Sequence, residues 1–517
     1  MKISGKDDPL YAKIVIAVLG VILVFAVYAH IRLYTLGTGL WYDEAALAGN
    51  IIDRSVRNML TQPLSNLQTA PLLYLICVKA LTVLFGAGEG VLRVFSLIAF
   101  LITLPVQALV MRRALGVAKP FVWFGICMTA TFGLYFRYSH ELKPYMSDTL
   151  FVLAVLLAYW WFREGRIRSV AFAAICCIVI LFSAPAAFFI AGVFITEILL
   201  RLRRKNLRAL FPLFGAGVLV LAVFVLNYLF WIQGSVSVSD MQDWWRNYHF
   251  DFFAHSSDTI RHNAEILFEL FASLGGWRIP LLVFACGGFV CSLRKRHAVT
   301  AAVGASVLLL LVASHLKMYP VYDRLWLFVY ALSFVYAALF LSAIFTGLAG
   351  GKEKPGPLRT AGRVAAIAAS FALLIGCSQL TGYATAEEEV KYPGDVTKPL
   401  IEYVREHIKE GEKFVGLGNA HLVVGYNNGY GSLRIGNVSE DNIVYSEKFV
   451  IAHDAVCVEA QKKAYVLMYQ YNSQLEDLLS ELRKTGDIEL VMDVHQTRLY
   501  YYCSADSILR QSIREDQ

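Results

Sequence analysis

Charged residues are scarce in this sequence. Asp, Glu, Lys and Arg make up 17% of its 517 residues, whereas soluble domains carry about 25%. Hydrophobic residues make up 57%, compared with about 45–50% in soluble domains. The composition excludes a soluble globular enzyme and a disordered chain, and it predicts a polytopic α-helical membrane protein.

Cysteine is almost absent from the polar parts of the sequence. Seven of the nine cysteines lie in or beside apolar runs, where cysteine behaves as a small hydrophobic residue. The other two, Cys457 and Cys503, could pair in an oxidising compartment, and the sequence leaves this open. The apolar composition excludes a secreted disulfide scaffold. Neither a Cys-x-x-Cys motif nor a metal-ligand spacing of cysteines occurs.

Long apolar runs alternate with short clusters of Lys and Arg. A helix needs about 20 apolar residues to cross the hydrocarbon core, and short cytoplasmic loops are enriched in Lys and Arg. When every basic cluster is placed in the cytoplasm, the chain must cross an even number of times between two clusters. The run 70–86 contains Pro71 and Lys79, and it is assigned to the outer interface. Eleven spans remain, near 14–34, 91–111, 121–136, 148–162, 170–182, 185–200, 209–231, 279–292, 298–315, 325–345 and 363–382.

The basic clusters also account for the net charge of +7. They lie in loops between spans, so no nucleic-acid partner is expected. The topology places the N-terminus in the cytoplasm and the first span, uncleaved, in the plasma (inner) membrane. The transmembrane domain covers 1–382, with outer loops 35–90 and 232–278, and residues 383–517 form an extracytoplasmic domain.

The composition changes near residue 383, where charge returns and long apolar runs stop. Helical spacing of apolar residues predicts a helix over 398–410, capped by Thr397, and a second helix over 473–485. Short β-rich runs predict strands at 414–419, 464–469, 488–495 and 498–503. The segment is therefore a small C-terminal α/β soluble domain, without a phosphate loop, a nucleophile elbow or a dinucleotide fingerprint.

The first outer loop opens with Leu-Trp-Tyr-Asp-Glu-Ala at 40–45. Apolar spacing predicts one amphipathic helix over 43–60 on the membrane surface, with Asp43 and Glu44 in its first turn. In one interpretation these acids only cap the helix and offset its dipole. In the other, a carboxylate held at the membrane boundary acts as general base on an acceptor hydroxyl.

The second outer loop is short and rich in polar side chains. It carries Arg137, His140, Glu141, Lys143 and Tyr145. One interpretation is a solvated loop with an ion pair between Glu141 and Arg137 or Lys143. The other is a cationic site for an anionic headgroup, because Arg and Lys donate charge-assisted hydrogen bonds to phosphate.

Two further outer segments carry candidate binding residues. The loop 315–324 contains Tyr322 and ends in Arg324, which either snorkels at a span end or faces a ligand. The loop 232–278 contains three histidines without metal-ligand spacing, so no metal site is expected there and a membrane-surface helix is favoured over sugar stacking.

Five segments of the chain form an ordered set. They are WYDEA at 41–45, QTAPLLYLI at 68–76, VLRVFSLIAF at 91–100, YSHELKPY at 138–145 and YPVYDRLWLF at 319–328. Together they resemble the membrane glycosyltransferases of C-type fold, in particular the protein O-mannosyltransferase and lipid A aminoarabinose transferase group. The resemblance covers roughly residues 10–345.

The resemblance implies a GT-C-like fold and a polyprenyl-phosphate-linked sugar as donor. It implies sugar transfer at the outer leaflet to a protein, lipid or glycan acceptor. Membrane lipids surround the transmembrane domain. Asp43 then corresponds to the base with Glu44 beside it, Glu141 to the second acidic position, and Arg324 to a partner of the donor phosphate. Lys143 stands where the family often has Arg.

Other function classes are weighed against this one. A lipid-linked sugar transporter or flippase is disfavoured, because the apolar segments lack paired Gly/Pro breaks and few ionisable residues lie at mid-span. A non-enzymatic membrane binding protein would present residues 383–517 without needing Asp43. No cofactor is indicated, and the sequence leaves open the sugar, the acceptor and whether a divalent cation assists.

Overall fold

A computed structural model of the chain describes residues 10–505, except for 38, 209, 234–238, 254–255, 296, 348–356, 382–396, 418–419, 421–422, 424–448, 453–457, 470–472 and 495–496. Cys457 lies outside the described residues, and with it the question, left open by the sequence, of whether it pairs with Cys503. The chain divides into two compact units. The first consists of residues 1–35, 69–78 and 93–385, and the second consists of residues 36–68, 79–92 and 386–517.

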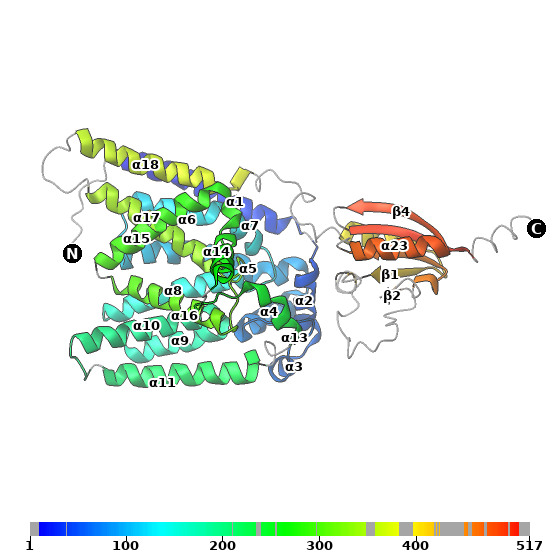
Figure 1. The fold of residues 1–517 in the computed structure, drawn as a ribbon, viewed down its shortest axis with the longest axis horizontal. Helices are drawn as coiled ribbons and strands as arrows, with labels where there is room; N and C mark the ends of the chain where they lie inside the picture. The colour runs from blue at the N-terminus through cyan, green and yellow to red at the C-terminus, as the bar shows by residue number, and fades with distance from the viewer. Residues whose placement is uncertain are drawn as a thin grey trace, which may run out of the picture. The chain divides into compact units, whose positions relative to one another are not determined.

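The first unit is a bundle of helices, which Figure 1 shows running side by side from α11 along one edge to α18 along the other. Two helices, α4 and α5, begin in one unit and end in the other. The α-helices of this part of the chain are α1 (Leu10–Thr35), α4 (Leu72–Phe85), α5 (Glu89–Leu109), α6 (Lys119–Thr131), α7 (Gly133–Ser139), α8 (Tyr145–Arg163), α9 (Ser169–Phe182), α10 (Ala184–Arg203), α11 (Leu210–Asn227), α13 (Ser239–Trp244), α14 (Ser257–Glu269), α15 (Arg278–Arg294), α16 (Ala298–His315), α17 (Leu327–Gly347) and α18 (Pro357–Cys377). Short π or 3-10 turns are η1 (Val110–Ala114), η2 (Tyr228–Ile232), η3 (Arg246–Tyr248) and η4 (Ala272–Trp277).

Nine helices among the described residues are long and apolar enough to cross a membrane. They begin at Leu10, Glu89, Tyr145, Ala184, Leu210, Ala272, Ala298, Leu327 and Thr360. The other two predicted spans correspond to α9, which has 14 residues, and to α6 with α7. Phe132 takes an extended backbone conformation between α6 and α7, so the predicted span 121–136 is broken there. The helix α4 has only 14 residues, about 21 Å, which is short for a crossing.

The core of the first unit is built around α17, whose apolar window is 78% buried. This helix packs against α6, α8, α15 and α18. At Gly288 of α15 a Cβ atom would collide with the backbone carbonyl of Tyr336, and at Gly192 of α10 it would collide with Ser306 of α16. Glycine at these two positions lets helix backbones approach closely, as is common between membrane helices.

The outward side chains of the bundle are also apolar. On α11, Phe211 is 81% exposed and Phe214 is 73% exposed. A bundle that is hydrophobic on both its inner and outer surfaces requires an apolar solvent. The chain is therefore a membrane protein.

The second unit contains a five-stranded sheet with the order β2-β1-β3-β5-β4. Its elements are α2 (Tyr42–Asp53), α3 (Val56–Thr61), α20 (Thr397–His407), β1 (Lys413–Leu417), β2 (Phe449–Ala452), β3 (Lys463–Met468), α23 (Ser473–Thr485), β4 (Gly486–Val494) and β5 (Thr497–Ser504). The strand β1 is parallel to β2 and β3, whereas β5 is antiparallel to β3 and β4.

Two helices cover opposite faces of this sheet. Leu479 of α23 packs into a core with Val466 and Tyr500, and Figure 1 shows α23 lying along the strands. The Tyr403 ring of α20 meets the ring of Tyr465, with 6.3 Å between the centroids. Because consecutive strand residues face opposite sides, α20 and α23 lie on different faces. The predicted α/β domain is confirmed, with β2 as an additional strand.

The predicted helix over 43–60 was wrong in one respect. The structure has two helices, α2 and α3, separated at Arg54, whose backbone is extended. Leu47, Ile51 and Met59 are fully buried, but Val56 is 43% exposed. The turn at Arg54 places Val56 off the apolar stripe that a single helix would have continued.

Candidate functional site

The loop between α7 and α8 is only five residues long, and its α7 end is anchored by His30 of α1. The His30 ring donates from Nε2 to the Ala130 carbonyl at 3.0 Å and bonds the Ser139 hydroxyl through Nδ1 at 2.7 Å. It stacks between the rings of Phe100 and Phe136, with centroids 3.8 and 4.1 Å away. Since Ser139 directly precedes the loop, His30 fixes where the loop begins.

The loop itself is buried despite its polar composition. His140, Glu141 and Lys143 are each 4% exposed or less. The Ser96 hydroxyl donates to the carbonyl oxygens of Glu141 and Lys143, at 2.8 and 3.2 Å. The Glu141 carboxylate pairs with the Arg137 guanidinium at 3.3 Å. The predicted Arg137–Glu141 ion pair is thus present, with the carboxylate buried in the protein and the Arg137 side chain 39% exposed.

Arg324 sits among aromatic rings brought together from three parts of the chain. Its guanidinium carbon lies 6.0 Å from the ring centroid of Tyr145, 5.6 Å from Trp245 and 5.5 Å from Tyr322. These distances are within the range of cation–π attraction. The Tyr248 carbonyl accepts a hydrogen bond from the Val321 amide at 2.7 Å, which ties η3 to the segment that carries Arg324.

A carboxylate besides Glu141, that of Asp323, lies next to Arg324 in the sequence. Burial raises the pKa of Asp323, although the Arg324 backbone amide and the charges of Arg324 and Arg137 act against the rise. The phenol of Tyr322 also has a raised pKa, through burial and then through the charge of Asp323, and Arg137 again acts on it in the opposite direction. Arg324 of the third predicted loop lies 6.0 Å from the ring of Tyr145 of the second loop, so the two loops form one site.

We call this set of side chains the cation–aromatic cluster. It consists of Arg137, Glu141, Tyr145, Trp245, Tyr322, Asp323 and Arg324. The N–H groups of the two guanidinium planes can donate hydrogen bonds to an anionic group. The neighbouring rings can contact a flat or apolar part of the same ligand.

The carboxylates Asp43 and Glu44 belong to the second unit, at the start of α2. Glu44 is 1% exposed, and its Oε2 accepts the Trp41 amide at 3.4 Å. Asp43 is half-buried, and its Oδ1 accepts a hydrogen bond from Gln68 Nε2 at 2.9 Å. Glu44 therefore acts as a helix cap, whereas the carboxylate of Asp43 is oriented by a side-chain amide.

The C-terminal part of the chain reaches the same helix start. The Tyr42 amide donates to the hydroxyl of Tyr469 at 3.2 Å, and Tyr469 is 2% exposed. The first amides of a helix have no partner within the helix. The Trp41 side chain makes no cap hydrogen bond, and the Tyr469 hydroxyl accepts the Tyr42 amide instead. Burial, and next the charge of Asp43, raises the pKa of the Tyr42 phenol.

The structure thus brings together Arg137, Glu141, Tyr145, Tyr322 and Arg324, while Asp43 and Glu44 share the start of α2. His140 and Lys143 lie buried in the same loop as Glu141.

Sequence reasoning did not single out Trp245, Asp323, Gln68 or Tyr469. Asp323 and Gln68 stand inside the quoted segments 319–328 and 68–76 and could have been found there. Trp245 was assigned to a surface helix, but the structure has only the short α13 and η3 around it, followed by α14.

The described residues contain no group of three or more His, Cys, Asp or Glu side chains that could hold a metal ion. His255 lies outside them.

No protein-family model matches the chain, and no curated protein sequence matches it significantly. Solved structures do match. The structure of ArnT from Cupriavidus metallidurans in the apo state has a TM-score of 0.54 at 12% identity, over 94% of this chain and 98% of that one. ArnT bound to undecaprenyl phosphate gives 0.52 at 13% identity, over 95% and 98%. The chain has the fold of the C-type membrane glycosyltransferases.

A second protein with this C-type fold supports the assignment. The oligosaccharyltransferase AglB from Archaeoglobus fulgidus, in complex with an inhibitory peptide and a dolichol-phosphate, matches with a TM-score of 0.50 at 13% identity. The match covers 94% of this chain and 74% of AglB. The predicted C-type fold with several membrane spans and a small α/β domain is confirmed.

Proposed function

We propose that the protein transfers a sugar from a polyprenyl-phosphate donor to a protein, lipid or glycan acceptor, at the outer face of the plasma (inner) membrane. The observation that carries this proposal is the cation–aromatic cluster, where Arg324 lies among three aromatic rings and both Arg137 and Arg324 act on the charge of Asp323. Two matched structures of the same fold contain undecaprenyl phosphate and dolichol-phosphate. A phosphate on an apolar chain has the chemistry that such a cluster would recognise.

The proposed reaction is a single displacement. Asp43 accepts the proton of the acceptor hydroxyl, the acceptor oxygen bonds to the anomeric carbon, and the bond from that carbon to the phosphate oxygen breaks. Polyprenyl phosphate leaves with the bonding electrons, and the charges of Arg324 and Arg137 stabilise it. Attack opposite the leaving group inverts the anomeric centre.

The local contacts favour different roles for the three predicted catalytic carboxylates. Asp43 is the one proposed as base, because it is partly accessible and Gln68 directs its carboxylate. Glu44 is buried and caps α2, so it positions Asp43. Glu141 pairs with Arg137 and positions that guanidinium, while Tyr145 and Tyr322 border Arg324. His140 and Lys143 remain proposed donor-binding residues, and the C-terminal domain is proposed to be extracytoplasmic and the N-terminus cytoplasmic.

The test is release of polyprenyl phosphate by the purified full-length protein in lipid. A panel of polyprenyl-phosphate sugars is supplied with total membrane extract as acceptor, and the productive donor identifies the sugar. We expect Asp43→Asn to lower the rate by about 10²–10⁴-fold, the usual range for a lost general base. Asp53→Asn, an exposed aspartate of the same helix, is the matched control and should keep the wild-type rate.

Other outcomes would change the proposal. Equal rates for Asp43→Asn and wild type would leave a transferase with a different base. No release from any donor, by protein whose melting temperature is normal, would contradict the transferase and favour a transporter or a binding protein.

A further inference from the structure

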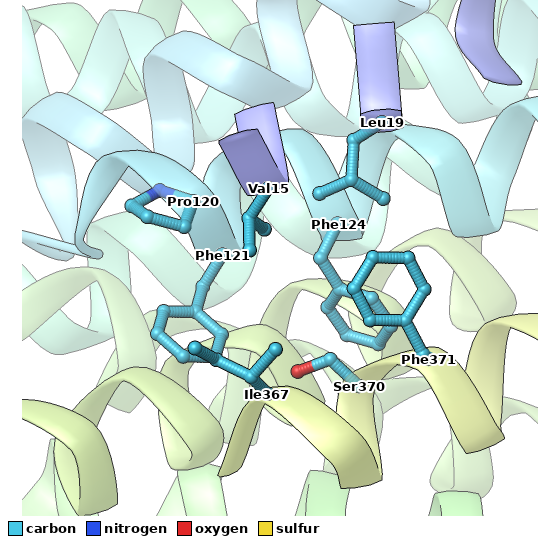
Figure 2. Close-up of a pocket in the computed structure, with 8 residues that line it drawn as sticks. All are labelled: Val15, Leu19, Pro120, Phe121, Phe124, Ile367, Ser370 and Phe371. Atoms are coloured by element: carbon cyan, nitrogen blue, oxygen red, sulfur yellow. The ribbon is translucent and has the colours of Figure 1, made fainter. Parts of the chain in front are cut away.

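An apolar crevice lies between α1, α6 and α18, with about 250 Å³ of empty space when its solvent-open part is included. Figure 2 shows side chains of the three helices turned toward one space. Val15 of α1, Phe121 and Phe124 of α6, and Ile367 of α18 line it. Its one hydroxyl, that of Ser370, donates to the Ala366 carbonyl of its own helix at 2.8 Å. The pocket therefore presents an apolar surface that an acyl chain could contact, and its one hydroxyl is already hydrogen-bonded.

On each of the three helices, a cation lies within four residues of a side chain that lines this pocket. Lys13 precedes the lining residue Val15 by two positions, Lys119 directly precedes the lining residue Pro120, and Arg363 lies one turn before Ile367. Lys13 and Lys119 are exposed. In each helix the cation stands near the N-terminal end, so the charges lie at the end of the bundle where these helices begin.

The ring of Phe345, near the end of α17, connects Arg363 with the pocket. Its centroid lies 6.2 Å from that of Tyr11 and 5.3 Å from that of Phe121. The Arg363 guanidinium carbon is 5.8 Å from the same centroid. Arg363 is therefore close to Phe121, which lines the pocket.

One donor of Arg363 remains unused within the described part of the chain. Its Nε atom is buried and has no hydrogen-bond partner among the residues that the structure describes. A buried guanidinium N–H without an acceptor is costly, and an anionic oxygen relieves that cost.

We propose that this pocket binds one anionic phospholipid, with an acyl chain against Phe121, Phe124 and Ile367 and the phosphate beside Arg363, Lys13 and Lys119. The apolar lining, and a cation within about one turn of a lining residue on each of the three helices, match the two parts of such a lipid. The predicted topology places these cations at the cytoplasmic leaflet, where anionic lipids attract juxtamembrane Lys and Arg.

The test measures lipids retained by the full-length protein. The protein is purified from bilayers with equal amounts of phosphatidylglycerol and phosphatidylcholine and examined by native mass spectrometry. We expect wild type to retain phosphatidylglycerol at least about tenfold more than phosphatidylcholine, because each juxtamembrane cation contributes several-fold. The triple variant Lys13→Gln, Lys119→Gln, Arg363→Gln should retain the two lipids to within about twofold.

A matched control removes three charges elsewhere. Arg204, Arg294 and Lys295 are exposed cations at the ends of α10 and α15, which do not line the pocket. Their replacement by Gln should leave the preference unchanged. An equal loss in the control, or no preference in wild type, would overturn the proposal, because the attraction would then be general or absent.

A second variant separates the pocket from the charges. Ser370→Phe fills the pocket and keeps every cation, so retention of the bound phosphatidylglycerol should be lost while helicity and elution volume stay normal. Unchanged retention would contradict binding in the pocket, and if this variant does not fold the charge variants still decide. Displacement of phosphatidylglycerol by an equal amount of polyprenyl phosphate would also overturn the proposal, because the site would then belong to that lipid. None of these measurements requires sugar transfer, so they test lipid binding independently of the proposed function.

Discussion

The two units hold their charged groups in different ways. At the start of α2, Asp43 and Glu44 are fixed by hydrogen bonds from Gln68 and the Trp41 amide. In the first unit, Arg324 is surrounded by the rings of Tyr145, Trp245 and Tyr322. Hydrogen bonds fix a carboxylate in direction, as a base requires. Stacking uses the face of a guanidinium, whereas a phosphate binds its N–H edge, so the two contacts are compatible.

The largest effect is the one expected above for Asp43→Asn in the second unit. The next largest is expected at Arg324 in the first unit. Arg324→Gln should raise the KM for the donor roughly 10–100-fold, because a charge-assisted hydrogen bond is worth about 1.5–3 kcal/mol. Initial rates against donor concentration measure this. Arg246→Gln removes an exposed cation of the same region and should leave KM unchanged. Similar effects of the two changes would mean that only the overall charge matters.

The second unit is tested at Tyr469. Tyr469→Phe removes one hydroxyl, the acceptor of the Tyr42 amide, at a cost of about 1 kcal/mol. We expect kcat to fall about fivefold, because α2 then holds Asp43 less firmly, while the donor KM stays the same. Tyr403→Phe, in the α20 contact of the same unit, is the control. A rise in donor KM with unchanged kcat would show that Tyr469 serves donor binding instead.

The smallest effect is expected at Asp323. Since burial raises its pKa in the folded protein, the folded state binds this proton more readily than the unfolded chain. The stability that comes from protonated Asp323 is therefore lost as the pH rises from the pKa of Asp323 in the unfolded chain through its raised pKa in the folded protein. Asp323→Asn should raise the melting temperature at pH 7, on the order of 1–2 °C, and change it little at pH 3.5. Equal shifts at both pH values would contradict this linkage.

Much of the fold follows from local patterns in the sequence. The apolar runs and basic clusters predicted the spans, including the pairing of the short helix α9 with α10. The break at Phe132 was missed because both sides of it are apolar, so hydropathy does not change there. The strand β2 has only four residues, too few for an alternating pattern to be recognised.

The candidate site was only partly predictable. Asp43, Glu141 and Arg324 stand out because charges are rare beside apolar runs. The rings around Arg324 come from positions as far apart as Tyr145 and Tyr322, and their meeting depends on helix packing that no local pattern encodes. The Trp245 ring could be placed only by knowing that η3 is hydrogen-bonded to the segment before Arg324.

The hydrogen bond between Tyr42 and Tyr469 joins residues 427 positions apart. A ribosome adds about 5–20 residues per second, so roughly 20–90 s separate the synthesis of the two ends of this bond. During that time the helix that carries Asp43 has already left the ribosome without its final cap. The cap of the proposed base's helix is therefore completed only after residue 469 has been synthesised, which delays full activity until the C-terminal sheet has been made.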